Sequence, residues 1–301
     1  MTSDTRTRSD VAFLSGDDTC RAWLFRPDTE NPPLVILGHG LGATREFGLE
    51  PYARRFAEAG IAALCFTYRH FGDSDGEPRQ LLDIEQQLGD WAAALAYART
   101  LEGIDRGRIA LWGTSFGGGH VIEAAARDGA VAAVVSQCPF TDGVAATRAA
   151  GPRSLARAIG PAVRDELARV RNKPPVMVPL VGPPGSTALM TSPDSEAGYR
   201  ALIPPGVQFE NTVAARFLNH VGRYRPGRSA QKLMCPILFC ICDRDAVAPP
   251  QAALRYAAAA PHGEVRRYPV GHFDIYRGEP FEHAVSDQTE FLARHLHTER
   301  A

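Results

Sequence analysis

The ten residues "ALWGTSFGGG" (Ala110–Gly119) decide the fold. The apolar run Ala110–Trp112 leads to Ser115, which stands between Gly113 and Gly117. A flexible linker after a strand would explain the glycines but leave the serine without a role. A strand that turns sharply into a helix explains the apolar run, the serine and the glycines together. At such an apex the residues two before and two after the serine pass close together, so side chains larger than hydrogen would collide. The stretch therefore predicts a strand–elbow–helix unit that lifts the Ser115 hydroxyl above a sheet.

The runs on either side of this unit predict a mostly parallel sheet. Several apolar runs, such as "LVILG" and "ILFCIC", show no polar–apolar alternation, which is typical of strands buried on both faces. They alternate with helical patterns. The helical candidates are Leu49–Ala59, Leu81–Leu95, Phe116–Arg127, Gln251–Ala260 and Phe281–Leu296. Near the N-terminus, Val11–Leu14 and Cys20–Arg26 flank a short turn and predict an antiparallel hairpin at one edge.

The alternation of strands and helices breaks between residues 143 and 232. Stretches such as "GPPGS" and "IPPG" interrupt short helical patterns there, and no buried strand is evident. The segment nevertheless holds too many apolar residues to stay solvated, namely Leu155, Ile159, Val163, Leu189, Met190, Phe209 and Phe217. We therefore expect residues 1–142 and 233–301 to form a core domain, and residues 143–232 to form a cap inserted over one edge of the sheet.

A nucleophilic serine needs a base, and the base needs an acid that orients it. In a sheet of this kind both follow late strands, in the order serine, acid, histidine. The apolar run "PILFCIC" leads into Asp243 and Asp245, and the last strand-like run ends just before His272. These positions lie at the carboxyl ends of strands, where sites in open α/β sheets gather. The sequence thus predicts Ser115 as nucleophile, His272 as base, and one of the two aspartates as acid.

A second glycine-rich turn predicts the groups that would stabilise an oxyanion. In "LVILGHGLGATRE", residues 34–46, a strand ends at His39 and Gly40. The backbone N–H of Leu41 would then point toward Ser115, beside the N–H of Phe116 at the start of the following helix. We expect these two N–H groups to form an oxyanion hole, and His39 to shape the turn by hydrogen bonding.

These motifs resemble the α/β-hydrolase superfamily over residues 34–301, with an interruption similar to that family's cap domain. The stretches "HGLGATRE", "YRHFGDSDGEPRQ", "GTSFGG", "DRDAVAPP" and "GHFDIY" are similar to those of the bacterial dienelactone-hydrolase-like and Xaa-Pro-peptidase-like (cocaine-esterase-like) serine esterases. The resemblance implies an α/β-hydrolase fold with a mostly parallel eight-stranded sheet, flanking helices and an inserted cap.

The resemblance also bears on the choice of acid. The family pattern G-D-x-D-x-x-x-P matches Cys242–Pro249, with cysteine in place of the first glycine. This match makes Asp245 the acid of the triad. Asp243 is the alternative within the same turn. Asp142, in "CPFTDG", is a third candidate because some family members take the acid from the preceding strand.

The expected chemistry is acyl transfer without a cofactor. Ser115 would form an acyl-enzyme that water releases, with His272 moving the proton. Hydrolysis of a carboxylic ester of a small, largely apolar substrate is the first interpretation. Thioester hydrolysis, lactone hydrolysis and a non-hydrolytic acyl-transfer step of secondary metabolism use the same residues and remain alternatives. A non-catalytic ligand-binding protein on this fold is the alternative of another class.

The composition argues against several partners. The net charge is −1 and no dense block of lysine or arginine occurs, so neither nucleic acid nor an anionic membrane surface is an expected partner. No apolar run reaches the length of a membrane span, and the polar stretch "MTSDTRTRSD" lacks the apolar centre of a secretory signal. We therefore expect a cytoplasmic monomer or homodimer that binds a small molecule.

The cysteines and the acidic residues do not predict a metal site. The six cysteines are scattered along the chain, several of them in strand-like runs, which indicates reduced, buried thiols. Cys240 and Cys242 share one side of a strand, and Asp73, Asp75 and Glu77 faintly resemble a calcium loop. Neither group has further ligands at a suitable spacing. The expectation is a site with no metal.

Overall fold

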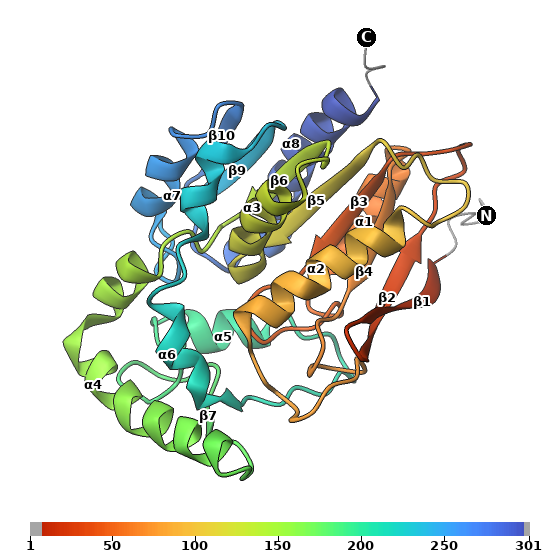
Figure 1. The fold of residues 1–301 in the computed structure, drawn as a ribbon. Helices are drawn as coiled ribbons and strands as arrows, with labels where there is room; N and C mark the ends of the chain where they lie inside the picture. The colour runs from red at the N-terminus through yellow and green to blue at the C-terminus, as the bar shows by residue number, and fades with distance from the viewer. Residues whose placement is uncertain (1–7, 298–301) are drawn as a thin grey trace.

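The computed structural model describes residues 8–297, which build an eight-stranded sheet in the order β1-β2-β4-β3-β5-β6-β9-β10 (Figure 1). The strands are β1 (Arg8–Ser15), β2 (Asp18–Phe25), β3 (Leu34–Gly38), β4 (Ala62–Phe66), β5 (Ile109–Thr114), β6 (Ala133–Gln137), β9 (Ile237–Cys242) and β10 (Gly263–Tyr268). β1 and β2 are antiparallel, and all pairs from β4 to β10 are parallel. The predicted mostly parallel sheet with a hairpin at one edge is confirmed.

Helices cover both faces of the sheet. They are α1 (Leu49–Glu58), α2 (Ile84–Ala98), α3 (Phe116–Asp128), α7 (Pro250–Ala257) and α8 (Gly278–Leu296). On β3, Ile36 packs into the core that holds α2, α3 and α7, whereas Val35 and Leu37 pack into the core that holds α1 and α8. Because successive side chains of a strand point to opposite faces, both sets of residues must be apolar. This explains why β3 has no polar–apolar alternation.

Two helices start at other residues than the sequence predicts, one of them because of a capping side chain. The spacing of apolar residues predicts a helix from Leu81, but α2 begins at Ile84 because the Asp83 carboxylate accepts a hydrogen bond from the Gln86 N–H and ends the preceding loop. α8 begins at Gly278, three residues before the predicted Phe281. The expectation about a signal segment concerns residues 1–10, of which residues 1–7 lie outside the described part.

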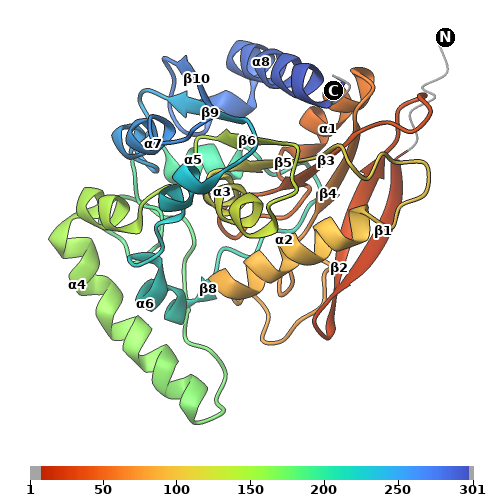
Figure 2. The same cartoon turned by 45° about the horizontal axis from the view of Figure 1, so that its top comes forward.

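Residues 143–232 hold short elements and one long helix. They are α4 (Gly143–Val170), β7 (Met177–Val178), α5 (Ser195–Arg200), β8 (Val213–Ala214), η1 (Ala215–Phe217), α6 (Leu218–Val221) and η2 (Pro226–Lys232). β7 and β8 form a two-stranded antiparallel sheet apart from the main one. Helix α4 is bent at Gly151, whose φ of 80° is in the left-handed region. Figures 1 and 2 show α4 at the outer boundary of the molecule, below the sheet in both views.

The two ends of this segment meet. The Gly143 N–H donates to the Tyr224 carbonyl at 2.8 Å, and the Arg225 guanidinium contacts the Asp142 carboxylate at 2.9 Å. The chain therefore leaves the sheet after β6 and returns toward β9 at nearly the same place.

One expectation about this segment is wrong. The apolar residues of α4 were expected to be buried, but Leu155, Ile159 and Val163 are 50%, 57% and 50% exposed. They lie on a side of α4 that no other described element covers. Met190 and Phe217, farther along the segment, are buried as expected. No helix within residues 8–297 is both long and apolar enough to cross a membrane.

Candidate active site

Ser115 occupies a sharp turn between β5 and α3. Its φ of 56° and ψ of −117° are strained for a residue with a side chain. A Cβ atom on Gly113 would lie 2.1 Å from the Gly117 carbonyl oxygen, and one on Gly117 would lie 2.4 Å from the His39 carbonyl oxygen. Because real side chains never approach backbone atoms so closely, this backbone path requires glycine at both positions.

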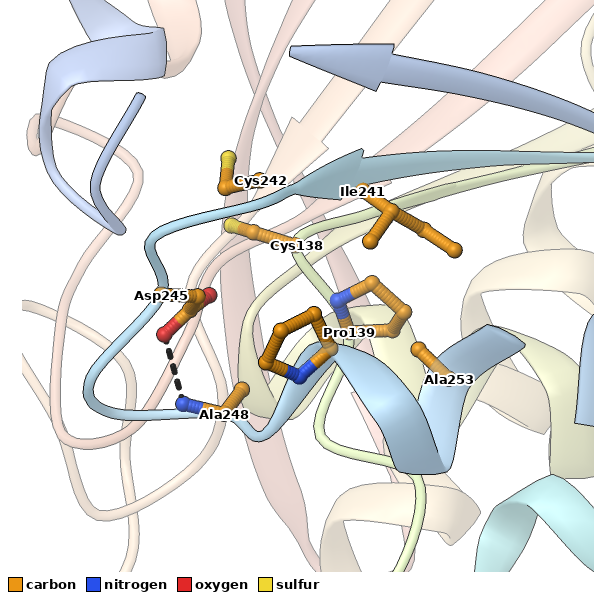
Figure 3. Close-up of a pocket in the computed structure, with 8 residues that line it drawn as sticks. Cys138, Pro139, Ile241, Cys242, Asp245, Ala248 and Ala253 are labelled. Atoms are coloured by element: carbon orange, nitrogen blue, oxygen red, sulfur yellow. Dashed lines mark hydrogen bonds between the residues drawn. The ribbon is translucent and has the colours of Figure 1, made fainter. Parts of the chain in front are cut away.

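The structure brings Ser115, His272 and Asp245 into one hydrogen-bonded line. The distance from His272 Nε2 to Ser115 Oγ is 3.0 Å, and the distance from His272 Nδ1 to Asp245 Oδ2 is 2.6 Å. The other oxygen of Asp245 accepts hydrogen bonds from the N–H groups of Val247 and Ala248, at 2.8 and 2.7 Å. Figure 3 shows Asp245 on the loop after β9, with its bond from Ala248. Each of the three side chains is buried.

Two buried histidines near this turn, His272 and His39, have pKa values shifted in opposite directions. Burial alone would lower the pKa of His272, but the adjacent Asp245 carboxylate outweighs burial and raises that pKa to about 9. Burial lowers the pKa of His39 to about 3. The neutral His39 ring donates from Nδ1 to the Gly40 carbonyl oxygen at 3.0 Å. His39 therefore supports the turn, as its sequence position predicts.

The two alternative acids lie elsewhere. Asp142 caps α4 by accepting hydrogen bonds from the N–H groups of Val144 and Ala145, at 3.0 and 3.1 Å. Asp243 pairs with Arg267 at the surface, at 2.8 Å. The structure brings neither carboxylate to His272.

The predicted oxyanion groups border the same space as Ser115. Leu41 and Phe116 both line the cavity above its hydroxyl. A Cβ atom on Gly40 would lie 3.0 Å from Ser115 Cβ, so the loop after β3 passes directly beside the serine. Phe116 is the first residue of α3, and its N–H therefore has no carbonyl partner one helical turn earlier. The positive end of the helix also favours a negative charge at this point.

A cavity of about 710 Å³ opens from Ser115. Its walls combine residues of the sheet loops with residues of the segment 143–232. Its large apolar wall residues include Phe140, Phe217, Leu189, Met190 and Val247, and the wall also contains the small residues Ala146, Ala149, Ala150 and Ala158 of α4. Arg157 and Arg223 are the charged residues of its lining, and no carboxylate is among the described residues that form it. The cavity therefore suits a largely apolar molecule.

Sequence reasoning missed several side chains that support the elbow from below. The Tyr276 hydroxyl contacts Thr114 Oγ1 at 2.5 Å, and the Cys138 thiol lies 3.5 Å from the same oxygen. On the helix side, His120 joins the Tyr224 hydroxyl (2.7 Å) to Gln87 Oε1 (2.9 Å). The polar residue types are visible in the sequence, but their pairing across 24 to 162 positions is not, because it depends on the tertiary fold.

The groups considered as metal ligands are engaged otherwise. Asp73 makes two hydrogen bonds to the Arg45 guanidinium, at 2.5 and 2.7 Å. None of the six cysteines, all of which lie in the described residues, forms a disulfide, and the Cys240 sulfur accepts a hydrogen bond from Gln288 Nε2 at 3.5 Å. Within residues 8–297 no group of three or more histidine, cysteine or acidic side chains is arranged to hold a metal ion.

Comparison with known proteins places this geometry among relatives. A family model described as "Alpha/beta hydrolase family" matches residues 12–284. The chain is 51% identical over 286 residues to the quorum-quenching protein AidA of Acinetobacter baumannii, covering 95% of this chain and 94% of that protein. It is 29% identical over 311 residues to the thiohydrolase aneE of Aspergillus aculeatus, covering 97% and 95%. The crystal structure of the α/β hydrolase GrgF from Penicillium sp. matches with a TM-score of 0.83 at 27% identity, covering 97% and 100%.

Proposed function

Because the chain belongs to the alpha/beta hydrolase family, we propose that it is a serine hydrolase that opens the ring of an acylated lactone. The observation that carries the proposal is the hydrogen-bonded line from Ser115 through His272 to Asp245 at the floor of a cavity of about 710 Å³. A lactone is a cyclic carboxylic ester, so the chemistry is that of the ester hydrolysis expected from the sequence. The similarity to a quorum-quenching protein favours the cyclic form, because opening the ring would inactivate a lactone signal.

The reaction follows from the positions of the reacting groups. His272 Nε2 accepts the proton of Ser115 while Oγ attacks the carbonyl carbon of the ring. The oxyanion that forms is stabilised by the N–H groups of Leu41 and Phe116. The ring C–O bond then breaks, and His272 returns the proton to the departing alkoxide. That hydroxyl remains part of the acyl group on Ser115. A water molecule, activated by His272, releases the hydroxy acid and restores the serine.

Residues 143–232 act as the cap in this proposal. They supply most of the cavity wall beyond Ser115, including Leu189, Met190 and Phe217. An acyl chain that lies against these side chains would be transferred from water to an apolar surface, which is favourable. The cap would therefore set the preferred chain length, and the triad would set the reaction.

Thioester hydrolysis is the second candidate. The similarity to a thiohydrolase over nearly the whole of both chains supports it. The same serine, base and oxyanion groups would act on a thioester, with a thiolate as the leaving group. The finer resemblance to dienelactone-hydrolase-like esterases supports the oxygen ester instead.

A substrate series tests the proposal. N-acyl homoserine lactones from butanoyl to dodecanoyl, the matching N-acetylcysteamine thioesters and p-nitrophenyl esters would be assayed by mass spectrometry. We expect lactone opening with an optimum chain length, and a loss of kcat of about 10⁴-fold or more in Ser115→Ala. Ser154→Ala, on the cavity wall, is the matched control and should stay within a fewfold of the wild type. Turnover of thioesters alone would favour the second candidate. Lactone opening that is undiminished in Ser115→Ala would overturn the mechanism.

A further inference from the structure

The outer side of α4 carries a continuous apolar stripe. It consists of Leu155, Ile159, Val163, Leu167 and Val170, which are 50%, 57%, 50%, 46% and 68% exposed. Their spacing of three or four residues places them on one side of the helix. Within residues 8–297 only Leu14 and Met234 are exposed large apolar residues outside this stripe. The exposed apolar surface of the described chain is therefore concentrated on one helix.

A row of arginines runs beside the stripe. Arg153, Arg157, Arg164 and Arg171 are spaced four and seven residues apart, so on a helix they fall into one row next to the apolar residues. All four are exposed, and none pairs with a carboxylate among residues 8–297. The sequence expectation of no anionic membrane partner rests on the absence of a contiguous basic block. Helical spacing assembles such a block from separated residues.

The two acidic residues of α4 do not balance this row. Asp165 is buried, where its carboxylate accepts hydrogen bonds from the Arg216 guanidinium at 2.9 and 3.0 Å. Glu166 pairs with Arg169 on the same helix at 2.5 Å. The contact between Asp165 and Arg216 also anchors the inner side of α4. The stripe and the arginine row are therefore presented outward on a helix that is fixed along its opposite side.

We propose that this outer side of α4 docks on an anionic phospholipid surface. A helix with an apolar stripe and arginines alongside it binds in the headgroup region, where the stripe leaves water and the arginines meet phosphates. A second copy of the chain would fit this face less well, because two arginine rows would meet. The other acidic residue of α4 besides buried Asp165 is Glu166, and it is already paired with Arg169. Figures 1 and 2 show that no other element lies outside α4.

The stripe reaches the lining of the cavity at one end. Leu155 belongs to both, and Arg157 of the adjacent row also lines the cavity. An amphiphilic molecule dissolved in the outer part of a bilayer would therefore reach the cavity along α4 without crossing bulk water. Docking itself does not require hydrolysis, so it can be measured whether or not the proposed reaction is the right one.

Vesicle sedimentation tests the proposal. The probes are vesicles of phosphatidylcholine alone and of phosphatidylcholine with phosphatidylglycerol, at low and high salt. We expect binding to the anionic vesicles, weakened by salt. The triple variant Arg153→Gln/Arg164→Gln/Arg171→Gln should bind more weakly by about fivefold for each arginine removed. The double variant Ile159→Glu/Val163→Glu should lose binding. Leu14→Glu, on β1, removes an even more exposed apolar side chain far from α4 and should bind like the wild type.

All the substituted side chains are exposed, so we expect each variant to fold. Thermal melting followed by circular dichroism checks this. Wild-type protein that stays in solution with the anionic vesicles at low salt would overturn the proposal. Equal binding by the wild type and the double variant would also overturn it. Sedimentation equilibrium distinguishes the other occupant: a dimer that Ile159→Glu/Val163→Glu converts to a monomer, with no vesicle binding, would assign the face to a second copy of the chain.

Discussion

The turn around Ser115 and the outer side of α4 are held in opposite ways. At the turn, backbone atoms lie within 2.1–2.4 Å of where a Cβ atom on Gly113 or Gly117 would stand. On α4, a Cβ atom added to Gly160 would meet nothing within 4 Å. In the first region the backbone around the flanking glycines is closely enclosed, so its conformation is determined by its own sterics. The second is supported along one side, so its exposed residues are available to another surface. The fixed geometry of the turn suits the proposed catalysis by Ser115, and the uncovered apolar side of α4 suits the proposed docking on a phospholipid surface.

The largest expected effect comes from adding one methyl group to each region. Gly113→Ala should cost about 4 kcal/mol or more of unfolding free energy, because its Cβ would overlap the Gly117 carbonyl. Gly160→Ala should change the free energy of unfolding by less than about 1 kcal/mol, because the better helix propensity of alanine opposes the contact between its Cβ and the ring of Pro161. Urea denaturation of both variants measures the contrast. Equal stabilities would show that the turn can relax, contrary to its enclosed geometry.

Two neighbouring aspartates sharpen the description of the enclosed region. Asp245→Asn should reduce kcat by about 10³–10⁴-fold, because the His272 ring loses the carboxylate that orients it. Asp243→Asn, two residues earlier, removes only an exposed pair with Arg267 and should change kcat by less than about twofold. Steady-state kinetics on a p-nitrophenyl ester compares the two. A large loss in Asp243→Asn would reassign the acid.

The support beneath α4 can be removed without touching its outer side. Asp165→Ala leaves the partly buried Arg216 guanidinium without its carboxylate and should cost about 3 kcal/mol. Glu166→Ala removes an exposed pair on the same helix and should cost less than about 0.5 kcal/mol. Thermal melting of the two variants measures the difference. If Asp165→Ala melts like Glu166→Ala, α4 is anchored by other contacts.

The smallest effect is a shift along the pH axis. His272 must be neutral to accept the proton of Ser115, and its pKa is raised to about 9 by Asp245. The value of kcat/KM should therefore rise about tenfold per pH unit below that pKa and level off above it. In Asp245→Asn, burial acts without the carboxylate and the midpoint should move to lower pH. A profile that keeps its midpoint in the variant would show that another group controls the titration.

The enclosed region was also the more predictable one. The glycine requirement at the turn is a local steric rule, and the order of serine, acid and histidine follows from the strand ends. The buried strands can be recognised in the sequence because both of their faces must be apolar. The choice among Asp142, Asp243 and Asp245 needed family resemblance, since it depends on which carboxylate the turn directs at His272. In the structure, the N–H groups of Val247 and Ala248 hold Asp245 in that position.

The outer side of α4 was predicted less well than the turn, for a physical reason. A run of apolar residues in a helix indicates that one side avoids water, but not what covers it. Leu155 and Ile159 were therefore counted among the residues that would not stay solvated, and they are exposed instead. The arginine row escaped notice because its members are four and seven positions apart and align only once the helix forms. The lining of the cavity depends on how residues 143–232 fold back over Ser115, which no local pattern reports.

The junction between Asp142 and Arg225 bears on how such an enzyme can diversify. Because the segment leaves and rejoins the sheet at points joined by the hydrogen bond from Gly143 to Tyr224, a replacement segment needs to match the core at one place only. A segment of different length and shape could be grafted there while the strand ends that carry Ser115 and His272 stay in place. Such an insertion can therefore evolve as a separate unit, so that the residues that contact the substrate change while the catalytic residues of the core stay the same.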